Sequence, residues 1–377
     1  MKITFLARSL LPGGAERQLV ALAKEMALMG HQVSVLVFYG GGALEEDLRD
    51  VGVPIIEIEK KGRWDIPGFL FRLYRHLRND KPNILNSYLT VPNILAVVMG
   101  WMIPSLNVVW GIRASNMALA EMDRVSSLSY RLEAQLSRLP DLIVVNSYAG
   151  REHCLSQGYP ESLMTVIPNG IDTKKFVPDS QRRSALRREW AVDEEEYIVA
   201  LIARIDPIKN HDCFLKAAAL LSRHRQDVRF ICVGGGDPGL ARRLKKQAED
   251  LGISDYLLWL GDRRDMVDVF NAVDLVTLTS FSEGFPNVIG EAMSCGVPCI
   301  TVDVGDCAIL LKGVGQVTVP EAEALSQAWG KALSCSEEEK CERSQAVRRR
   351  IEKQFSVSAL AQKTQDAFLS ILEEAPP

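Results

Sequence analysis

The sequence lacks a strong net charge and paired cysteines. Its 377 residues carry 44 Lys and Arg against 48 Asp and Glu, a net charge of −4, so the overall balance does not favour nucleic acid as a partner. The eight cysteines show no C-x-x-C spacing, and Cys295 and Cys299 have no histidine nearby. This pattern indicates buried thiols in a reducing cytosol rather than metal ligands.

A membrane-spanning run is also missing. No charged residue lies between Lys81 and Arg113, but prolines and asparagines leave only 94–103 as an unbroken apolar piece, well short of the roughly 20 residues that a span requires. We expect strand, buried helix and strand there. The amino end is interrupted by charge too soon for a signal peptide and is typical of a first strand. A cytoplasmic protein is therefore expected.

Strands and helices alternate along the whole chain, which is long enough for two domains. Apolar runs predict strands near 2–7, 32–39, 54–58, 83–88, 107–112 and 141–146, and again near 197–203, 228–233, 256–260, 274–278 and 298–302. Such alternation predicts an α/β protein with doubly wound parallel sheets. The sequence indicates two Rossmann-like domains, 1–175 and 176–357.

Two glutamates bracket the start of a short predicted helix. Glu283 precedes it and Glu291 lies in its second turn, with Pro286 suited to the first helical position and Gly296 marking the end. The positive end of the helix dipole would hold a phosphate oxygen, and both carboxylates could accept hydrogen bonds from sugar hydroxyls. Taken alone, the pair favours two solvated glutamates on a surface helix, which is the usual place of a glutamate.

Two cations follow the strand predicted over 197–203. Arg204 and Lys209 lie where that strand ends and before the next helix, and ligands of open α/β sheets bind at such carboxyl ends. A guanidinium can direct two N–H groups at a diphosphate and an ammonium adds a point charge, which suits an anionic leaving group. Taken alone, either residue favours an ordinary surface cation beside Asp206.

Taken together, these motifs resemble glycosyltransferase family 4, retaining enzymes of the GT-B fold. The matching segments are, in chain order, 12–17, 167–172, Arg204 with Lys209, 234–238, 282–286 and 291–298. They span nearly the whole chain, and their order is more specific than any single motif. The resemblance implies two domains facing across a cleft, with the final helix, 358–377, packing back on the first. It also implies transfer of a sugar from a UDP- or GDP-sugar to a glycan, glycolipid or small-molecule acceptor, in polysaccharide or glycoconjugate synthesis.

Residue roles follow from the same resemblance. Arg204 and Lys209 would neutralise the diphosphate and Glu283 would touch the reactive face of the donor sugar, which makes these three the catalytic candidates. Glu291 would hold the ribose hydroxyls. The other donor-binding candidates are Gly13, Gly14, Gly284, Phe285, Pro286, Asn287, Val288 and Arg263. No metal or other cofactor is expected, since two cations and a helix end serve the diphosphate.

The acceptor side departs from the family pattern. Family members often carry histidines after the strand that here ends at 86–88, whereas this chain has Asn86 and Tyr88. Arg113 and Asn116, after the next strand, are polar substitutes there, or else helix-capping and surface groups. Together with Glu16 these are the acceptor-side candidates. Because the histidines are missing, a non-catalytic nucleotide-sugar-binding protein stays open, as does epimerisation of a nucleotide sugar.

Two further interpretations remain. The loop 234–239 fits G-x-G-x-x-G after a strand, with Asp262 some 23 residues on, which favours an NAD-type oxidoreductase. That alternative leaves Arg204, Lys209 and both glutamates without a role. Separately, cations and aromatics mix in a helical pattern over 60–81, which is typical of a peripheral membrane contact at the inner face or of an ordinary amphipathic surface helix.

Overall fold

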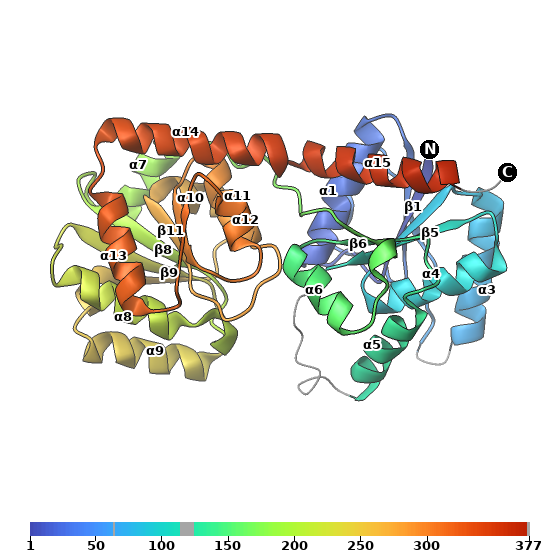
Figure 1. Cartoon of the computed structure of the whole chain (residues 1–377), viewed down its shortest axis with the longest axis horizontal. Helices are drawn as coiled ribbons and strands as arrows, with labels where there is room; N and C mark the ends of the chain where they lie inside the picture. The colour runs from blue at the N-terminus through green and yellow to red at the C-terminus, as the bar shows by residue number, and fades with distance from the viewer. Residues whose placement is uncertain (63–64, 114–123, 375–377) are drawn as a thin grey trace. The chain divides into compact units, whose positions relative to one another are not determined.

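The computed structural model describes residues 1–62, 65–113 and 124–374. The chain forms two compact units (Figure 1), one made of Met1–Gly170 with Val357–Pro377 and the other of Ile171–Ser356. The division falls at Gly170, five residues before the expected boundary at 175. The Gln18 side chain bonds both the N–H and the C=O of Gly170, at 2.9 and 3.0 Å, whereas the Ile171 N–H already donates to the Phe355 carbonyl, at 2.7 Å.

The first unit contains a seven-stranded sheet of order β3-β2-β1-β4-β5-β6-β7, and its strands pair in parallel. The strands are β1 Lys2–Ala7, β2 Gln32–Val37, β3 Ile55–Glu57, β4 Ile84–Tyr88, β5 Asn107–Ile112, β6 Leu142–Val145 and β7 Met164–Val166. The sequence predicted the first six. The three-residue β7 is too short and too little buried to give a strand pattern.

Helices cover both faces of this sheet (Figure 1). They are α1 Gly14–Leu28, α2 Glu45–Arg49, α3 Ile66–Asp80, α4 Thr90–Met102, α5 Arg124–Leu136, α6 Tyr148–Ser156 and α15 Val357–Glu374, with a 3-10 turn η2 at Glu161–Leu163. The final helix, α15, packs beside α1, and its Leu360 and Phe368 join the core that α1 and the sheet share.

Helix α4 differs from the expected buried helix. Ala96, Val97 and Met99 do enter the core against the sheet, but Trp101 is 86% exposed and Val91 is exposed too. A helix that covers one face of a sheet buries one side only. The absence of charge along its sequence therefore does not mean that the whole helix is inside.

The second unit contains a six-stranded parallel sheet of order β10-β9-β8-β11-β12-β13. The strands are β8 Tyr197–Ile202, β9 Val228–Val233, β10 Leu257–Gly261, β11 Leu275–Leu278, β12 Cys299–Val302 and β13 Gln316–Thr318. The helices are α7 Ser180–Glu189, α8 His211–Ser222, α9 Pro238–Asp250, α10 Met266–Ala272, α11 Asn287–Ser294, α12 Cys307–Leu311, α13 Ala322–Leu333 and α14 Glu337–Gln354, with 3-10 turns η3 Pro207–Lys209 and η4 Ser254–Tyr256.

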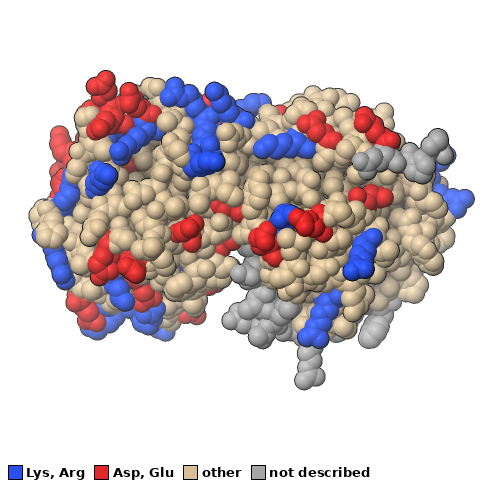
Figure 2. Space-filling model, in the orientation of Figure 1, with Lys and Arg blue, Asp and Glu red and all other residues tan. Residues whose placement is uncertain are grey.

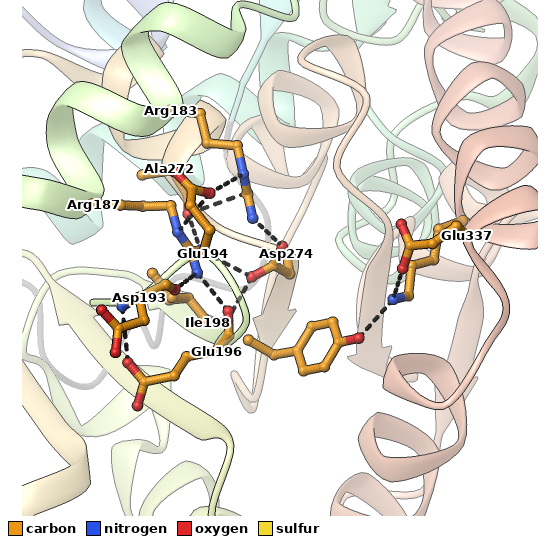
Figure 3. Close-up of polar contacts among 11 residues, drawn as sticks. Arg183, Arg187, Asp193, Glu194, Glu196, Ile198, Ala272, Asp274 and Glu337 are labelled. Carbon is orange, nitrogen blue, oxygen red and sulfur yellow. Dashed lines mark hydrogen bonds and ion pairs between the residues drawn. The ribbon is translucent and has the colours of Figure 1, made fainter.

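A buried arginine fixes the amino-terminal edge of this second sheet (Figure 3). Arg187 of α7 is fully buried and donates to the Ala272 carbonyl at 3.1 Å and to Asp274 at 3.3 Å. Asp274 also accepts from the Ile198 N–H at 2.7 Å. The Asp274 carboxylate thus joins α7 to the starts of β8 and β11. The loops that carry the candidate site lie at the opposite, carboxyl edge of the sheet.

Charged side chains of both signs are interspersed on the face drawn in Figure 2, in keeping with the small net charge. Across the ranges that the structure describes, no helix combines the length and apolarity needed to cross a bilayer.

Candidate active site

The loop after β8 carries the two predicted cations. Asp206 caps η3 by accepting from the Ile208 N–H at 3.0 Å, and its other oxygen pairs with Arg204 at 3.0 Å. The Arg204 guanidinium is 70% exposed. An exposed guanidinium that is paired with a single carboxylate can turn toward an anionic ligand at little cost.

Lys209 and Glu283 form the centre of the site. Lys209 Nζ donates to Glu283 Oε1 at 2.5 Å, and both side chains are largely buried. Ser280 Oγ donates to the same oxygen at 2.6 Å, while Thr279 Oγ1 donates to the Lys209 carbonyl at 2.9 Å. The loops after β8 and β11 are therefore joined by side chains, and within the described part of the chain Glu283 Oε2 has no hydrogen-bond partner.

Helix α11 follows this pair directly. Pro286 takes the N-cap position, one residue earlier than the first helical position predicted, and Gly296 ends the helix with φ +78°. Gly284, Phe285 and Pro286 make the entry, Asn287 and Val288 begin the first turn, and half-buried Glu291 lies in the second. The positive end of the helix dipole thus lies next to the Lys209–Glu283 pair, an arrangement suited to an anion.

A second loop, the one after β12, packs against the backbone at Glu283. Gly305, after β12, has φ +54°, and a Cβ built on it would lie 2.6 Å from the Gly284 oxygen and 2.7 Å from the Glu283 oxygen. The Asp306 N–H donates to the Gly284 carbonyl at 3.0 Å. Burial raises the pKa of the neighbouring Cys307 thiol to about 12, so this thiol stays protonated near neutral pH.

The glycine-rich loop 234–239 is packed against the backbone that follows β8, on both sides of Arg204. A Cβ on Gly234 would lie 2.3 Å from the Ala203 oxygen, and one on Gly236 would lie 2.1 Å from the Ile205 oxygen. Asp262 accepts from the Gly235 N–H at 2.6 Å. These close backbone approaches explain the glycines without a bound dinucleotide. Asp262, the acid that an NAD-type enzyme would use to bind a ribose, accepts a hydrogen bond from this loop instead.

Arg263 is held by groups of the second unit. Its guanidinium donates to Asp265 and to Glu189 and lies 5.9 Å from the centre of the Trp190 ring. The hydrogen bonds to Asp265 are the main cause that raises its pKa. The structure therefore gives this predicted donor-binding side chain a bridging position between the end of α7 and the start of α10.

One histidine beside the site is almost completely buried. His211, the first residue of α8, is 2% exposed, and neither ring nitrogen has a hydrogen-bond partner among the described residues. Burial lowers its pKa to about 4. The imidazole is therefore neutral at pH 7 and adds no charge to the site.

The glycine motif of the first unit lies where β1 leads into α1. Gly13 is the N-cap of α1 and Gly14 its first residue. The Glu16 carboxylate lies directly over Gly13. A Cβ built on Gly13 would be only 2.2 Å from Glu16 Oε2. The sequence predicted Glu16 on the acceptor side, and the structure places its carboxylate at this helix start.

The remaining acceptor-side candidates gather at the ends of β4 and β5. Arg113 donates to the Tyr88 hydroxyl at 2.7 Å and to Asn169 Oδ1 at 2.9 Å, and its guanidinium carbon lies 4.7 Å from the Tyr88 ring centre. Burial raises the Tyr88 pKa, which keeps the hydroxyl neutral. Asn86 is buried on the same strand, and the predicted Asn116 lies outside the described residues.

Three residues of these clusters were missed in the sequence: Ser280, Gly305 and Asn169. Gly305 and Ser280 follow β12 and β11, so the rule that ligands bind at carboxyl ends of strands could have identified both. Asn169 lies in the 167–172 segment that was read only as a link between domains. Within the described residues, no group of three or more His, Cys, Asp and Glu is arranged to hold a metal ion.

Comparison with protein families decides the assignment. The model described as "Glycosyltransferase Family 4" matches residues 12–175, and the one described as "Glycosyl transferases group 1" matches residues 196–335. The chain belongs to the family 4 glycosyltransferases. The two matches follow each other in the order that the motifs predicted, one in each unit of the structure.

Curated relatives of this family 4 glycosyltransferase include a "D-inositol 3-phosphate glycosyltransferase" of Mycobacterium sp. (strain KMS), 34% identical over 220 residues, 56% of this chain and 49% of the relative. A second is the "UDP-Gal:alpha-D-GlcNAc-diphosphoundecaprenol alpha-1,3-galactosyltransferase" of Escherichia coli, 26% identical over 64% of this chain and 63% of the relative. The matched part thus spans about half the length of the first of these relatives.

Solved structures confirm the fold. The Anabaena protein HepE, crystallised in complex with UDP, matches with a TM-score of 0.84 at 22% identity, over 98% of this chain and 100% of HepE. This family 4 glycosyltransferase therefore has the GT-B fold, two Rossmann-like units, as predicted.

Proposed function

We propose that the chain transfers a sugar from a nucleotide diphosphate sugar to a glycan, glycolipid or small-molecule acceptor, with retention of configuration and without a metal. The observation that carries the proposal is the Lys209–Glu283 pair at the amino end of α11. It supports the proposal because a fixed cation and a positive helix end would stabilise a departing diphosphate, and the carboxylate beside them could orient the sugar.

The chemistry is electrostatic in this proposal. Lys209 and the amino end of α11 stabilise the charge that develops on the diphosphate as the bond to the sugar breaks, and Arg204 adds a mobile charge. Glu283 orients the sugar through the oxygen that Lys209 and Ser280 leave available. Glu291 accepts hydrogen bonds from the ribose. No step requires a protein nucleophile.

A uridine nucleotide is the first donor to test, because HepE was crystallised with UDP and the galactosyltransferase relative is named for UDP-Gal. We propose a melting-temperature screen against UDP-, GDP- and ADP-sugars, since a donor at a hundred times its Kd adds about 2.7 kcal/mol to stability. Donor hydrolysis and transfer are then assayed with wild type and Glu283→Ala, with and without EDTA.

The outcomes separate the candidate functions. Binding of a nucleotide sugar with release that depends on Glu283 and is indifferent to EDTA supports the transferase. Binding without any release above background favours a non-catalytic binder. A changed donor with no acceptor consumed favours epimerisation, and stabilisation by NAD but by no nucleotide sugar would overturn the proposal. The anomeric configuration of the product, read by NMR, tests retention.

A further inference from the structure

A cavity opens into the second unit at the amino-terminal edge of its sheet. It has a volume of about 280 Å³ and lies at the starts of β8, β11 and β12, between helices α7, α13 and α14. The Lys209–Glu283 pair, in contrast, follows the carboxyl ends of β8 and β11. Since β8 has six residues, roughly 20 Å of strand separates the two edges of the sheet. The cavity is therefore distinct from the candidate active site.

Apolar side chains make up much of the cavity wall. Leu275 is 1% exposed and Val273 is 3% exposed, so the cavity reaches atoms of the hydrophobic core. Its volume is close to the lower end of the range for small-molecule sites, about 300 to 1,000 Å³, and such sites combine apolar walls with a few polar groups. The apolar lining suits the body of a small molecule and consists of Val273, Leu275, Val297, Pro298, Ala332 and Leu333.

The two acids that line the cavity are paired with arginines of the second unit. Asp274 pairs with Arg183 at 2.8 Å and with Arg187 at 3.3 Å (Figure 3). Asp179 pairs with Arg182 at 3.1 Å, and its side chain also caps the start of α7. Because both carboxylates are neutralised in this way, the cavity is poorly suited to a cationic ligand.

Arg343 of α14 carries a charge that has no counterion in the second unit. It lines the cavity and is half-buried, and among the described residues it forms no hydrogen bond or ion pair. The acids near it on α14 are engaged elsewhere or exposed. Glu337 pairs with Lys340 at 2.5 Å, and Glu339 forms the capping box of the helix. Glu342 is exposed and does not line the cavity.

Two hydroxyl groups that line the same cavity have protons to donate. The Tyr197 oxygen accepts from Lys340 Nζ at 2.6 Å, and its own O–H has no acceptor within the part of the chain that the structure describes. Ser344 Oγ lies over Gly296, where a Cβ would be only 2.5 Å from it, and it has no hydrogen-bond partner among the same residues. A guanidinium with two O–H donors suits the oxygen atoms of a phosphate or carboxylate.

We propose that this cavity binds a small organic anion that consists of one phosphate or carboxylate group on an apolar or aromatic body. The anionic group would lie at Arg343, Tyr197 and Ser344, and the body would lie against the apolar lining. A wholly apolar ligand fits less well, because it would bury the Arg343 charge without a partner. The proposal does not depend on glycosyl transfer, since binding is measured without donor or acceptor.

The probe is phenyl phosphate, titrated calorimetrically into the full chain. Phenol and inorganic phosphate, the two parts of the same molecule, are titrated separately. We expect phenyl phosphate to bind at least about tenfold more tightly than either part, because phenol lacks the charge and inorganic phosphate lacks the apolar body. A phosphate that binds as tightly as phenyl phosphate would indicate an adventitious ion only and would overturn the proposal.

Variants of the lining locate the bound probe. Arg343→Gln should weaken binding at least about tenfold, and Tyr197→Phe about fivefold, through loss of hydrogen bonds to the anion. Ala332→Phe should abolish binding, because its ring would fill the space for the apolar body. Arg349→Gln is the matched control, since Arg349 is an exposed arginine of the same helix outside the lining, and it should bind as wild type does.

Melting temperatures establish that each variant is folded. The proposal is overturned if wild type does not bind phenyl phosphate at millimolar concentrations, or if Arg343→Gln binds it as wild type does. Binding that UDP displaces and that Arg343→Gln and Ala332→Phe leave unchanged would place the probe at the candidate active site and also overturn the proposal. A chain that binds phenyl phosphate in the cavity but binds no nucleotide sugar would support this inference and contradict the proposed function, so the two failures are distinguishable.

Discussion

Gly305 approaches Glu283 so closely that any side chain at 305 would meet the backbone of the catalytic candidate. A Cβ there would lie 2.7 Å from the Glu283 carbonyl oxygen, and the residue has φ +54°. The loop after β12 therefore sets the position of the chain that carries Glu283, although the two residues belong to different strand-to-helix connections. Two separate penalties, backbone strain and a clash, oppose substitution at this glycine.

Gly305→Ala is expected to lower both stability and nucleotide-sugar binding. The positive φ alone costs about 1 kcal/mol or more for an alanine, and the clash displaces the loop at 283–284. Gly313→Ala is the matched control, because Gly313 has φ +78° and nothing within 4 Å of its Cβ position. Urea unfolding and donor titration are measured for both. Equal losses of binding in the two variants would show that the contact with Glu283 does not matter.

Glu291→Ala is expected to weaken nucleotide diphosphate binding by about 1 to 3 kcal/mol, through loss of charge-assisted hydrogen bonds to the ribose. Isothermal titration with the diphosphate and with the 2′-deoxyribose analogue measures the effect, and the analogue should bind wild type more weakly but the variant no worse. Glu342→Ala, an exposed glutamate of α14, is the control. An unchanged affinity in Glu291→Ala would refute the assignment.

The sequence could predict those parts of the fold and site that depend on local signals. Pro286 and Gly296 mark the limits of α11 because proline fixes the backbone locally and glycine permits the positive φ that ends a helix, and the alternation of apolar runs predicted eleven of the thirteen strands. The helix at 357–374 was placed beside the first domain only by resemblance. The boundary at Gly170 was missed by five residues, since it depends on hydrogen bonds from Gln18, 152 positions away in the sequence.

Other features were beyond a sequence pattern. The loop 234–239 satisfies a dinucleotide motif, because a motif counts glycines and cannot say whether they make room for a ligand or for the backbone at Ala203 and Ile205. The pairing of Arg113 with Tyr88 and Asn169 joins three separate connections of one sheet. Charge-free α4 was predicted to be buried, since composition does not show which side of a helix the sheet covers.

The two cations of the site are expected to act mainly on turnover. Arg204→Ala should lower kcat more than it weakens donor binding, because its exposed charge matters most as the diphosphate leaves. Lys209→Ala should have the larger effect, since it also leaves the largely buried Glu283 without its 2.5 Å partner. Steady-state kinetics with independent donor titrations separates the two quantities. Equal losses in kcat and in donor affinity would count against this role.

His211 is expected to make the second unit less stable in mild acid. Its pKa is about 4 in the folded chain because of burial, against about 6.5 when unfolded. Between these values the unfolded chain binds a proton that the folded chain does not, so stability is full above pH 6.5 and falls as pH drops toward 4. The loss at pH 5 relative to pH 7.5 amounts to about 2 kcal/mol.

Urea unfolding at pH 7.5 and pH 5 measures this dependence in wild type, His211→Phe and His224→Gln. His211→Phe should lose about 2 kcal/mol less than wild type over the interval, because phenylalanine takes up no proton. His224 is exposed, so His224→Gln should follow wild type. Because other groups titrate over the same interval, the comparison between variants carries the test. Identical pH dependence in wild type and His211→Phe would mean that the buried imidazole is already charged or accessible in the folded chain.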